Sequence, residues 1–272
     1  MQVFPLSPAA LFASACGHRT LLASLAQREV LGRYRGSMLG LAWSFFTPLL
    51  MLAVYTFVFG VIFKARWGTG SESRTEFALV LFVGMMVFNL FAECVSRAPS
   101  LVLANPNYVK RVVFPLEVLP WVTLAAALFH LGASLLVWLV AYLVLVGTPP
   151  ATALLLPGVL LPLLLLTLGV CWLFASLGVY LRDVGQFINV LITVLMFLAP
   201  VFYPATAVPE SLRVWLYANP LTLPIEMARD VLCWGRLPDG SLWLASLAAG
   251  GLMAWAGFAW FQKTRRGFAD VL

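Results

Sequence analysis

The sequence predicts an all-α membrane protein with six transmembrane helices, and three observations lead to that prediction. Hydrophobic residues make up 62% of the chain and charged residues only 10%, whereas a soluble domain carries about 25% charged residues. The charges lie between five uncharged stretches, residues 36–63, 77–92, 118–181, 184–209 and 240–262. The third stretch is long enough for two crossings and carries a Gly-Thr-Pro-Pro turn signal at 147–150. Because a charge at the centre of a membrane helix costs about 2.5–3.5 kcal/mol, this pattern indicates a chain folded in a bilayer.

Residues 1–35 precede the first uncharged stretch and are expected to lie on the membrane surface. Ser7 followed by Pro8 predicts the start of a helix. Leucines between Leu11 and Leu25 and a basic run after them are typical of an amphipathic helix in the interface. We therefore divide the chain into an N-terminal region with an interface helix, residues 1–35, and a transmembrane domain, residues 36–272.

The spans are expected to be helical because lipid offers no partner to unpaired backbone groups. A hydrocarbon core of about 30 Å needs about 20 apolar residues per helix. The six predicted spans are residues 38–63, 77–94, 118–146, 152–181, 187–203 and 241–261.

The segment between the fifth and sixth spans, residues 204–240, is too broken by proline for a full crossing and too apolar for a solvated loop. Short helices that dip into the outer leaflet fit this composition, since irregular backbone is tolerated there when protein shields it. We expect a re-entrant periplasmic region.

The basic residues predict the orientation. With the N-terminus in the cytoplasm, 11 of the 17 lysines and arginines fall inside and 6 outside, while the acidic residues divide into 5 inside and 6 outside. This bias follows the positive-inside rule and places both termini in the cytoplasm. It also accounts for the net charge of +6, so we expect no nucleic-acid partner.

Few residues are suited to catalysis, so the sequence does not predict an enzyme. The four cysteines form no Cys-x-x-Cys pair and the histidines, His18 and His130, are far apart, which predicts no metal site. His130 falls within a predicted span, where packing or hydrogen bonding is its expected role. No lysine follows a glycine, so the phosphate loop of ATPases is absent. The carboxylates Glu93 and Glu117 stand at the ends of spans, which disfavours a proton-driven carrier.

Two sets of residues are candidates for a transport path. Glu226, Arg229 and Asp230 form either a local ion pair three residues apart or, with Tyr203, a gate at the outer exit. The aromatic residues cover more than one face of the first span, so lipid contact explains most of them. A subset is expected to stack on sugar rings, and the candidates are Trp43, Phe46, Tyr55, Phe59 and Phe197.

Several short motifs occur in a fixed order along nearly the whole chain after residue 20. They are QREVLGRYRGSMLGLAWSFFTPLLMLAVYTFVFGVIFK at 27–64, NPNYVKRVVFPLEVLP at 105–120, YLRDVGQF at 180–187, APVFYP at 199–204, NPLTLPIEMARDVL at 219–232 and GFADVL at 267–272. In order and spacing they resemble the ABC-2 type permeases that export polysaccharides such as O-antigen or teichoic acid.

The resemblance implies partners that the composition does not indicate. Two copies of the permease would form a homodimer in the bacterial inner membrane and bind two copies of a separate ABC ATPase, which holds ATP and Mg. This chain would then need no cofactor of its own. By this resemblance, the segment that docks on the ATPase would consist of Asn105, Pro106, Asn107, Tyr108, Val109, Lys110 and Arg111. The first and fifth spans of both copies would flank the channel, and residues 204–235 would form the outer gate.

The function implied is ATP-driven export of a lipid-linked polysaccharide, with O-antigen as the first expectation. The diphosphate of the lipid would be attracted by Arg28, Arg33 and Arg35, which flank Tyr34 in the interface helix; the alternative is that these arginines only set the topology. Two other functions stay open. One is an ABC-2 exporter of another substrate, such as teichoic acid, capsule, a drug or a lipid. The other is a membrane glycosyltransferase, which would need carboxylates positioned on donor sugars.

Overall fold

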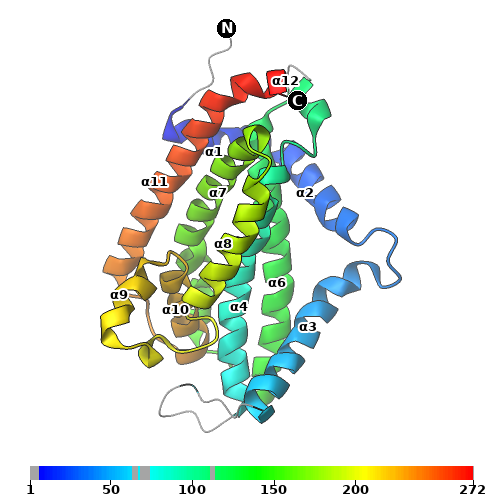
Figure 1. Ribbon diagram of the computed structural model, residues 1–272. Helices are drawn as coiled ribbons and strands as arrows, with labels where there is room; N and C mark the ends of the chain where they lie inside the picture. The colour runs from blue at the N-terminus through cyan, green and yellow to red at the C-terminus, as the bar shows by residue number, and fades with distance from the viewer. Residues whose placement is uncertain (1–5, 63–66, 68–73, 111–113, 272) are drawn as a thin grey trace.

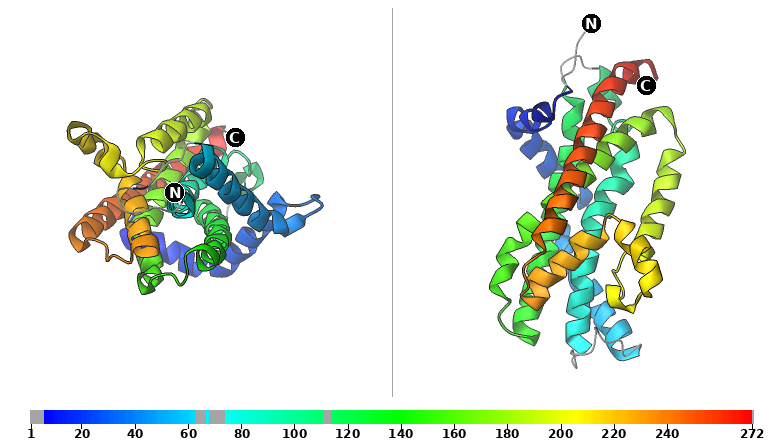
Figure 2. Two further views of the ribbon diagram at one scale, coloured as in Figure 1. Left: turned by 90° about the horizontal axis from the view of Figure 1, so that it is seen from below. Right: turned by 90° about the vertical axis from the view of Figure 1, so that its left-hand side faces the viewer.

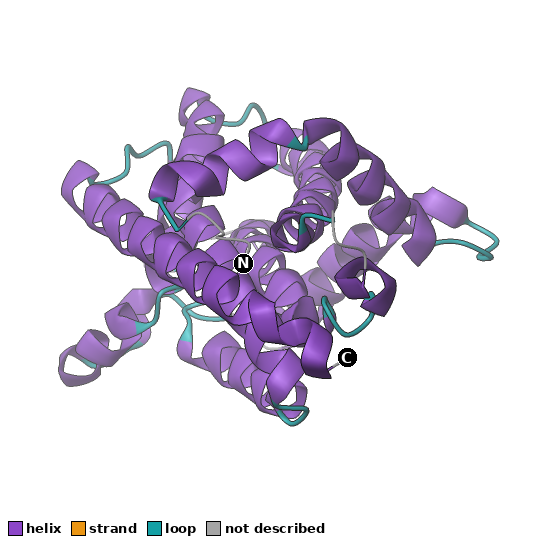
Figure 3. Cartoon of the chain, turned by 90° about the horizontal axis from the view of Figure 1, so that it is seen from above, coloured by secondary structure: helices purple, strands orange, loops and turns teal. Residues whose placement is uncertain are grey.

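The computed structural model describes residues 6–62, 67, 74–110 and 114–271. Within these ranges all regular structure is helical, as predicted, and no strand occurs (Figures 1 and 3). The α-helices are α1 Pro8–Gly17, α2 Arg19–Arg33, α3 Trp43–Tyr55, α4 Arg74–Arg97, α5 Pro106–Lys110, α6 Leu119–Leu145, α7 Leu156–Tyr180, α8 Val184–Leu198, α9 Glu210–Ala218, α10 Thr222–Arg229, α11 Gly240–Thr264 and α12 Phe268–Val271. Short 3-10 and π-helical turns extend several of them, among them η2 Thr56–Ile62, η3 Ala98–Ser100, η4 Leu116–Val118 and η7 Asp230–Trp234.

Five continuous helical stretches are long and apolar enough to cross a membrane: Gly40–Phe59, Glu76–Ser100, Leu116–Leu145, Ala151–Tyr180 and Gly240–Val271. They correspond to the first, second, third, fourth and sixth predicted spans, although the first predicted span ends at a residue outside the described ranges. The predicted fifth span corresponds to α8, which has 15 residues and is therefore about 22 Å long. The helix ends at Leu198, and the next residue, Ala199, has the extended backbone that a following proline, Pro200, favours. By itself α8 is shorter than the hydrocarbon core.

α4 is the most deeply buried of these stretches. Of its most apolar window 78% lies inside the protein, against 11% for the stretch that contains α3. α4 contacts α3, α6, α7, α8 and α10, so most of the bundle packs around it. α3 and α11 lie at opposite edges of the bundle (Figures 1 and 2).

Small residues allow α7 and α11 to pack closely. A Cβ atom added at Gly257 would collide with the carbonyl group of Gly169, and one added at Gly169 would collide with the backbone of Met253. Close approach through small residues is a common way for membrane helices to associate, because lipid leaves little hydrophobic driving force between them.

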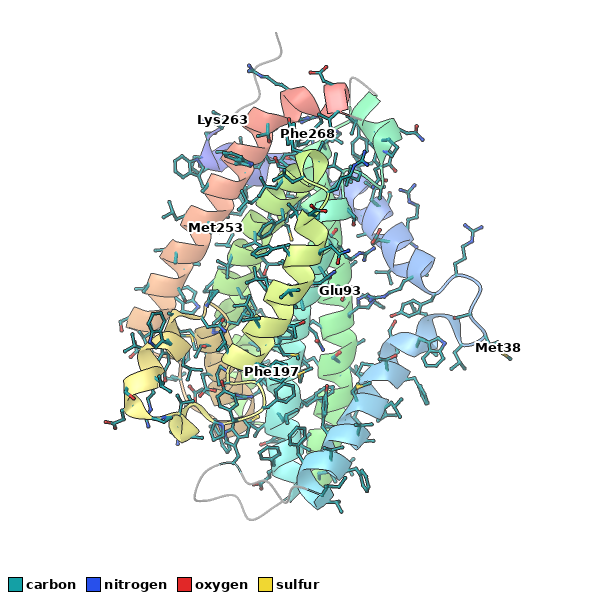
Figure 4. All side chains as sticks on the ribbon, viewed as in Figure 1. Met38, Glu93, Phe197, Met253, Lys263 and Phe268 are labelled. Atoms are coloured by element: carbon teal, nitrogen blue, oxygen red, sulfur yellow. The ribbon has the colours of Figure 1, made fainter. Side chains whose placement is uncertain are left out.

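The N-terminal region and the C-terminus share one end of the bundle. α1 and α12 both lie there, and α12 also contacts α5 (Figure 1). The Ser7 side chain accepts a hydrogen bond from the backbone N–H of Ala10 and Pro8 is the first residue of α1, which confirms the predicted helix start. α2 and α3 form a bent arm along one side, with Met38 at its tip (Figure 4).

At the other end, the segment between α8 and α11 folds into short helices, as expected. α9 exposes Val214 and Trp215 to its surroundings, whereas α10 is largely buried against α4 and α7. The hydroxyl of Thr152 donates to the carbonyl oxygen of Val231 at 2.7 Å and fastens η7 to the start of the α7 stretch.

Candidate functional site

A cavity of about 640 Å³ opens between α3, α4, α6 and α8, with the end of α2 at its rim. Many of its lining side chains are polar, although the helices around it are mostly apolar. Side chains with hydroxyl or amide groups come from all four helices: Ser44, Thr47, Asn89, Ser96, Ser134, Asn189 and Thr193. Hydroxyls and amides can both donate and accept hydrogen bonds without carrying charge. The cavity therefore suits a neutral ligand with many hydroxyl groups.

Three charged or titratable side chains meet at the rim of this cavity. Nη1 of Arg33 lies 2.5 Å from Oε1 of Glu93. Nδ1 of His130 lies 2.9 and 3.0 Å from the two Glu93 oxygens. Arg33 belongs to the last turn of α2, Glu93 to α4 and His130 to α6, so the cluster joins three helices. Figure 4 shows Glu93 part-way along the bundle, between Phe268 near one end and Phe197 towards the other.

Tyr34 completes the cluster. Its hydroxyl lies 3.3 Å from Nε2 of His130, and the two rings meet edge to face with centroids 6.2 Å apart. A neutral histidine that donates from Nδ1 to Glu93 can accept at Nε2 from the tyrosine. The arrangement thus satisfies both ring nitrogens. We refer to Arg33, Tyr34, Glu93 and His130 as the rim cluster.

The predicted ATPase-docking segment lies against α2. Nη2 of Arg28 donates to the hydroxyl of Tyr108 at 2.7 Å, and Tyr108 stacks on Phe114 with centroids 4.1 Å apart. Next to Arg28, Glu29 forms an ion pair with Arg97 at the end of α4. α2 is therefore fixed to α5, α4 and α6 by side chains from its second half.

The residues of this docking segment begin a helix rather than a free turn. Asn105 precedes α5, its side chain donates to the carbonyl oxygen of Leu101 at 3.0 Å, and its own carbonyl accepts from the N–H of Tyr108. Pro106 is the first residue of α5, Asn107 is exposed and Val109 is half-buried. Lys110 ends α5, whereas Arg111 lies outside the described residues.

The five candidate channel aromatics divide between two places. Trp43 and Tyr55 line the cavity, and Phe46 meets Trp43 edge to face at 5.5 Å. Phe59 and Phe197 instead pack on either side of Phe202, at 6.1 and 6.2 Å, towards the other end of the bundle.

One of the candidate gate residues, Arg229, is a buried arginine that pairs with a second candidate, Glu226. The Arg229 side chain is 1% exposed and donates to the carbonyl oxygens of Val80, Pro200 and Val201 at 3.1, 2.5 and 2.8 Å. It also pairs with Glu226 at 2.8 Å, the spacing of three residues that the sequence indicated. Trp67 covers the guanidinium at 4.3 Å from its ring centroid.

The two other gate candidates, Asp230 next to this arginine in the chain and Tyr203 just after α8, are not part of its hydrogen-bond network among the described residues. Burial raises the pKa of Asp230, and the nearby Glu226 carboxylate raises it further. The hydroxyl of Tyr203 donates to the carbonyl oxygen of Phe197 at 3.1 Å. This hydrogen bond attaches the segment that follows α8 to the last turn of that helix.

Comparisons with known proteins identify the family. A family model described as "ABC-2 type transporter" matches residues 20–233. The chain belongs to this family. It is similar to an O-antigen export system permease protein of Myxococcus xanthus, with 31% identity over 94% of this chain and 96% of the relative. A protein of the same name from Klebsiella pneumoniae is 25% identical over 93% of this chain and 95% of its own. A polysialic acid transport protein of Escherichia coli is 22% identical over 78% and 81%.

Reasoning from the sequence of this ABC-2 chain missed part of the site. The sequence indicates Glu93 only as a carboxylate at a span end and His130 only as a packed or hydrogen-bonded histidine. A single acid and a single histidine in two apolar spans are the signal that could have predicted their contact. The pairing of Glu29 with Arg97 and the polar lining from Asn89 and Asn189 were missed as well. Among the predicted residues, Arg33, Tyr34, Trp43 and Tyr55 come together at the cavity, whereas Arg35 is exposed beside it.

Proposed function

We propose that this chain is the membrane-spanning permease subunit of an ATP-driven exporter that moves a lipid-linked polysaccharide, first of all O-antigen, from the cytoplasm to the periplasm. The observation that carries the proposal is the similarity over almost the full length to permeases named for O-antigen export. A cavity that carries many hydroxyl and amide side chains within mostly apolar helices supports it, because sugars hydrogen-bond through hydroxyl groups.

In this proposal the chain crosses the bacterial inner membrane six times, with α8 as the fifth span and both termini in the cytoplasm. The end of the bundle that carries α1, α5 and α12 would face the cytoplasm, in agreement with the surplus of basic residues expected there. Helices α9, α10 and η7 would form the periplasmic region, re-entrant with respect to the outer leaflet.

The functional unit would contain two copies of the permease. α8 carries a row of exposed apolar residues at Phe187, Val190, Val194 and Phe197, a spacing that places them on one helix face. α8 is also about 8 Å shorter than the hydrocarbon core. A second copy that covers this face, together with α3, would enclose a channel between the two protomers.

Energy would come from two copies of a separate ABC ATPase that binds ATP and Mg. Pro106–Lys110, the helix α5, would dock on this partner, and its displacement would reach α2 through the hydrogen bond between Tyr108 and Arg28. The bundle would then move largely as a rigid body. The diphosphate of the lipid carrier would be attracted to Arg33, with Arg28 and Arg35 nearby.

Export of another substrate by the same machinery is the second candidate. The relative named for polysialic acid transport favours a capsular polysaccharide. A glycosyltransferase is less well supported, because the carboxylate that lines the cavity, Glu93, is engaged by Arg33 and His130 and is not free to assist sugar transfer.

Export in a bacterium that lacks its own O-antigen permease tests the proposal. The chain, expressed together with the ATPase that co-purifies with it, should restore O-antigen to the cell surface, and a variant ATPase without hydrolysis should leave the glycan inside. Surface glycan that appears without any ATPase, or sugar transfer by the purified chain alone, would contradict the proposal.

A further inference from the structure

The rim cluster contains an ion pair that the proposed transport mechanism does not explain. Glu93 holds the side chain of Arg33, the basic residue nearest to the cavity, although the proposal requires this arginine to attract phosphate. The Glu93 side chain is 15% exposed and that of Arg33 is 49% exposed. The arginine side chain is thus accessible to a ligand, whereas its carboxylate partner is mostly buried.

Resting on the proposed function, we infer that Glu93 is a built-in substitute for the phosphate group of the substrate. In the empty permease it occupies Arg33, and the diphosphate of the lipid carrier displaces it. A carboxylate and a phosphate are both oxyanions that accept charge-assisted hydrogen bonds from a guanidinium. One can therefore replace the other on the same donors.

His130 makes this exchange feasible. A carboxylate left without a partner in a low-dielectric environment is costly. Glu93, however, keeps two hydrogen-bond contacts to Nδ1 of His130, at 2.9 and 3.0 Å, when Arg33 leaves. Tyr34 holds the other ring nitrogen of His130 at 3.3 Å and so keeps the ring in place for Glu93.

Arg33 has donors to spare for a ligand. In the described part of the chain Nη1 is the Arg33 nitrogen that donates to Glu93, whereas a guanidinium offers five N–H donors. Arg33 ends α2, and Arg35 follows in the exposed turn. A diphosphate that approaches from the inner leaflet would meet these two cations at the rim before it meets the hydroxyl and amide groups deeper in the cavity.

The inference makes the diphosphate itself the group that is recognised, so binding can be measured without the ATPase or the glycan. The probe is farnesyl diphosphate, titrated into the purified permease in nanodiscs of neutral phosphatidylcholine and followed by calorimetry. Glu93→Gln keeps the shape of the side chain and removes its charge. It should tighten binding about tenfold, the effect of one competing charged hydrogen bond.

Other variants distinguish displacement of Glu93 from Arg33 by the diphosphate from a general effect of net charge on binding. Arg33→Gln should weaken binding about tenfold or more. His130→Leu should also weaken it, because Glu93 then cannot release Arg33, and the double variant of Glu93→Gln with His130→Leu should bind as tightly as Glu93→Gln alone. The last result is a coupling between neighbours that a purely structural role of His130 would not produce.

Glu117→Gln is the matched control. Glu117 pairs with Arg265 at 2.5 Å and is 13% exposed, so it resembles Glu93 in charge and burial but does not line the cavity. This variant should leave binding unchanged. Thermal unfolding of every variant checks that the fold is intact.

The inference would be overturned by no tightening in Glu93→Gln, by equal tightening in Glu117→Gln, or by equal binding of farnesol, which lacks phosphate. Loss of binding in nanodiscs that contain phosphatidylglycerol would assign the site to bilayer headgroups and would also overturn it. Export restored in cells together with any of these results would leave the proposed function standing and remove only the role of Glu93.

Discussion

At the residue scale, Arg229 shows how a charge can be accommodated in an apolar bundle. Its guanidinium is shared among three backbone carbonyls, a carboxylate and an indole ring. Two of those carbonyls belong to Pro200 and Val201, which follow α8 and lie in a turn outside any helix. Arg229 therefore attaches the end of α8 to α10 and to α4.

Replacing Arg229 should destabilise the protein strongly. Arg229→Leu leaves the carbonyls unpaired and the Glu226 carboxylate uncompensated, and breaking such a buried pair costs about 3–5 kcal/mol. Arg229→Lys should recover only part of this, because an ammonium group lacks the planar fork that reaches several acceptors. Thermal unfolding of the purified chain in detergent measures both.

The control for this prediction is Arg236→Gln, which removes the same charge from an exposed side chain a short distance along the chain. Its unfolding temperature should equal that of the unaltered protein. If Arg229→Leu unfolds at the same temperature as this control, the arginine does not attach α8 to α10.

At the scale of elements, α7 and α11 form the tightest contact of the bundle and depend on glycine. Gly257 faces the carbonyl of Gly169 with no space for a side chain. Such contacts bring backbones close enough for dispersion forces to act along the whole helix pair. The pair thus joins α11, at the edge of the bundle away from α3, to the rest of the bundle (Figure 1).

Gly257→Leu should separate this pair and lower the yield of folded protein, because overpacking a tight contact costs about 1–3 kcal/mol or more. Gly251→Leu lies on the same helix, where an added Cβ meets nothing within 4 Å, and should be tolerated. Monodispersity in size-exclusion chromatography and thermal unfolding compare the two. Equal behaviour of the two variants would show that close packing at Gly257 is unimportant.

A second element, α2, links the predicted docking helix to the cavity. It contacts Tyr108 through Arg28 and the rim cluster through Arg33. Such a chain of contacts is a path by which a displacement of α5 would reach the cavity, and measured coupling between its two ends tests it.

Tyr108→Phe removes the hydroxyl that accepts from Arg28 and keeps the stacking on Phe114. Since the hydrogen bond is exposed, the stability of the fold should change little. Export per ATP hydrolysed should fall several-fold, because a displacement of α5 would then move α2 less. Export and phosphate release in proteoliposomes with the partner ATPase give this ratio. An unchanged ratio would exclude this contact from the coupling path.

At the scale of the whole molecule, the bundle exposes large apolar side chains on several helices. They occur on α3 and on one face of α8, and also on α6 and α11. Lipid can cover such a face, but α8 is too short to span alone. We therefore expect the exposed face of α8 to meet a second copy.

Cross-linking in membranes tests this expectation. In a chain whose four cysteines are replaced by serine, Val194→Cys should give a covalent dimer with a bis-maleimide cross-linker, because the two α8 helices face each other across the channel, too far apart for a direct disulfide. Val140→Cys on α6 is equally apolar and exposed and should remain monomeric. Dimers from both positions, or only from Val140→Cys, would contradict the proposed interface.

The sequence by itself determined the solvent, the fold class and most helices. Uncharged stretches, prolines and the Ser7-Pro8 start are local signals, because each reflects what lipid or a helix end requires of neighbouring residues. The same local signals also limited what could be predicted. They placed a fifth span at residues 187–203, where the tertiary structure has a 15-residue helix that ends before Pro200.

Only the tertiary structure decided the composition of the site. Arg33 and Glu93 are 60 residues apart in the chain and Arg33 and His130 are 97 apart, and no periodicity in the sequence relates them. Arg229 likewise meets Val80 across 149 residues. Such partners are selected by how the helices pack, since a buried charge must find its counterpart wherever the bundle brings one within reach.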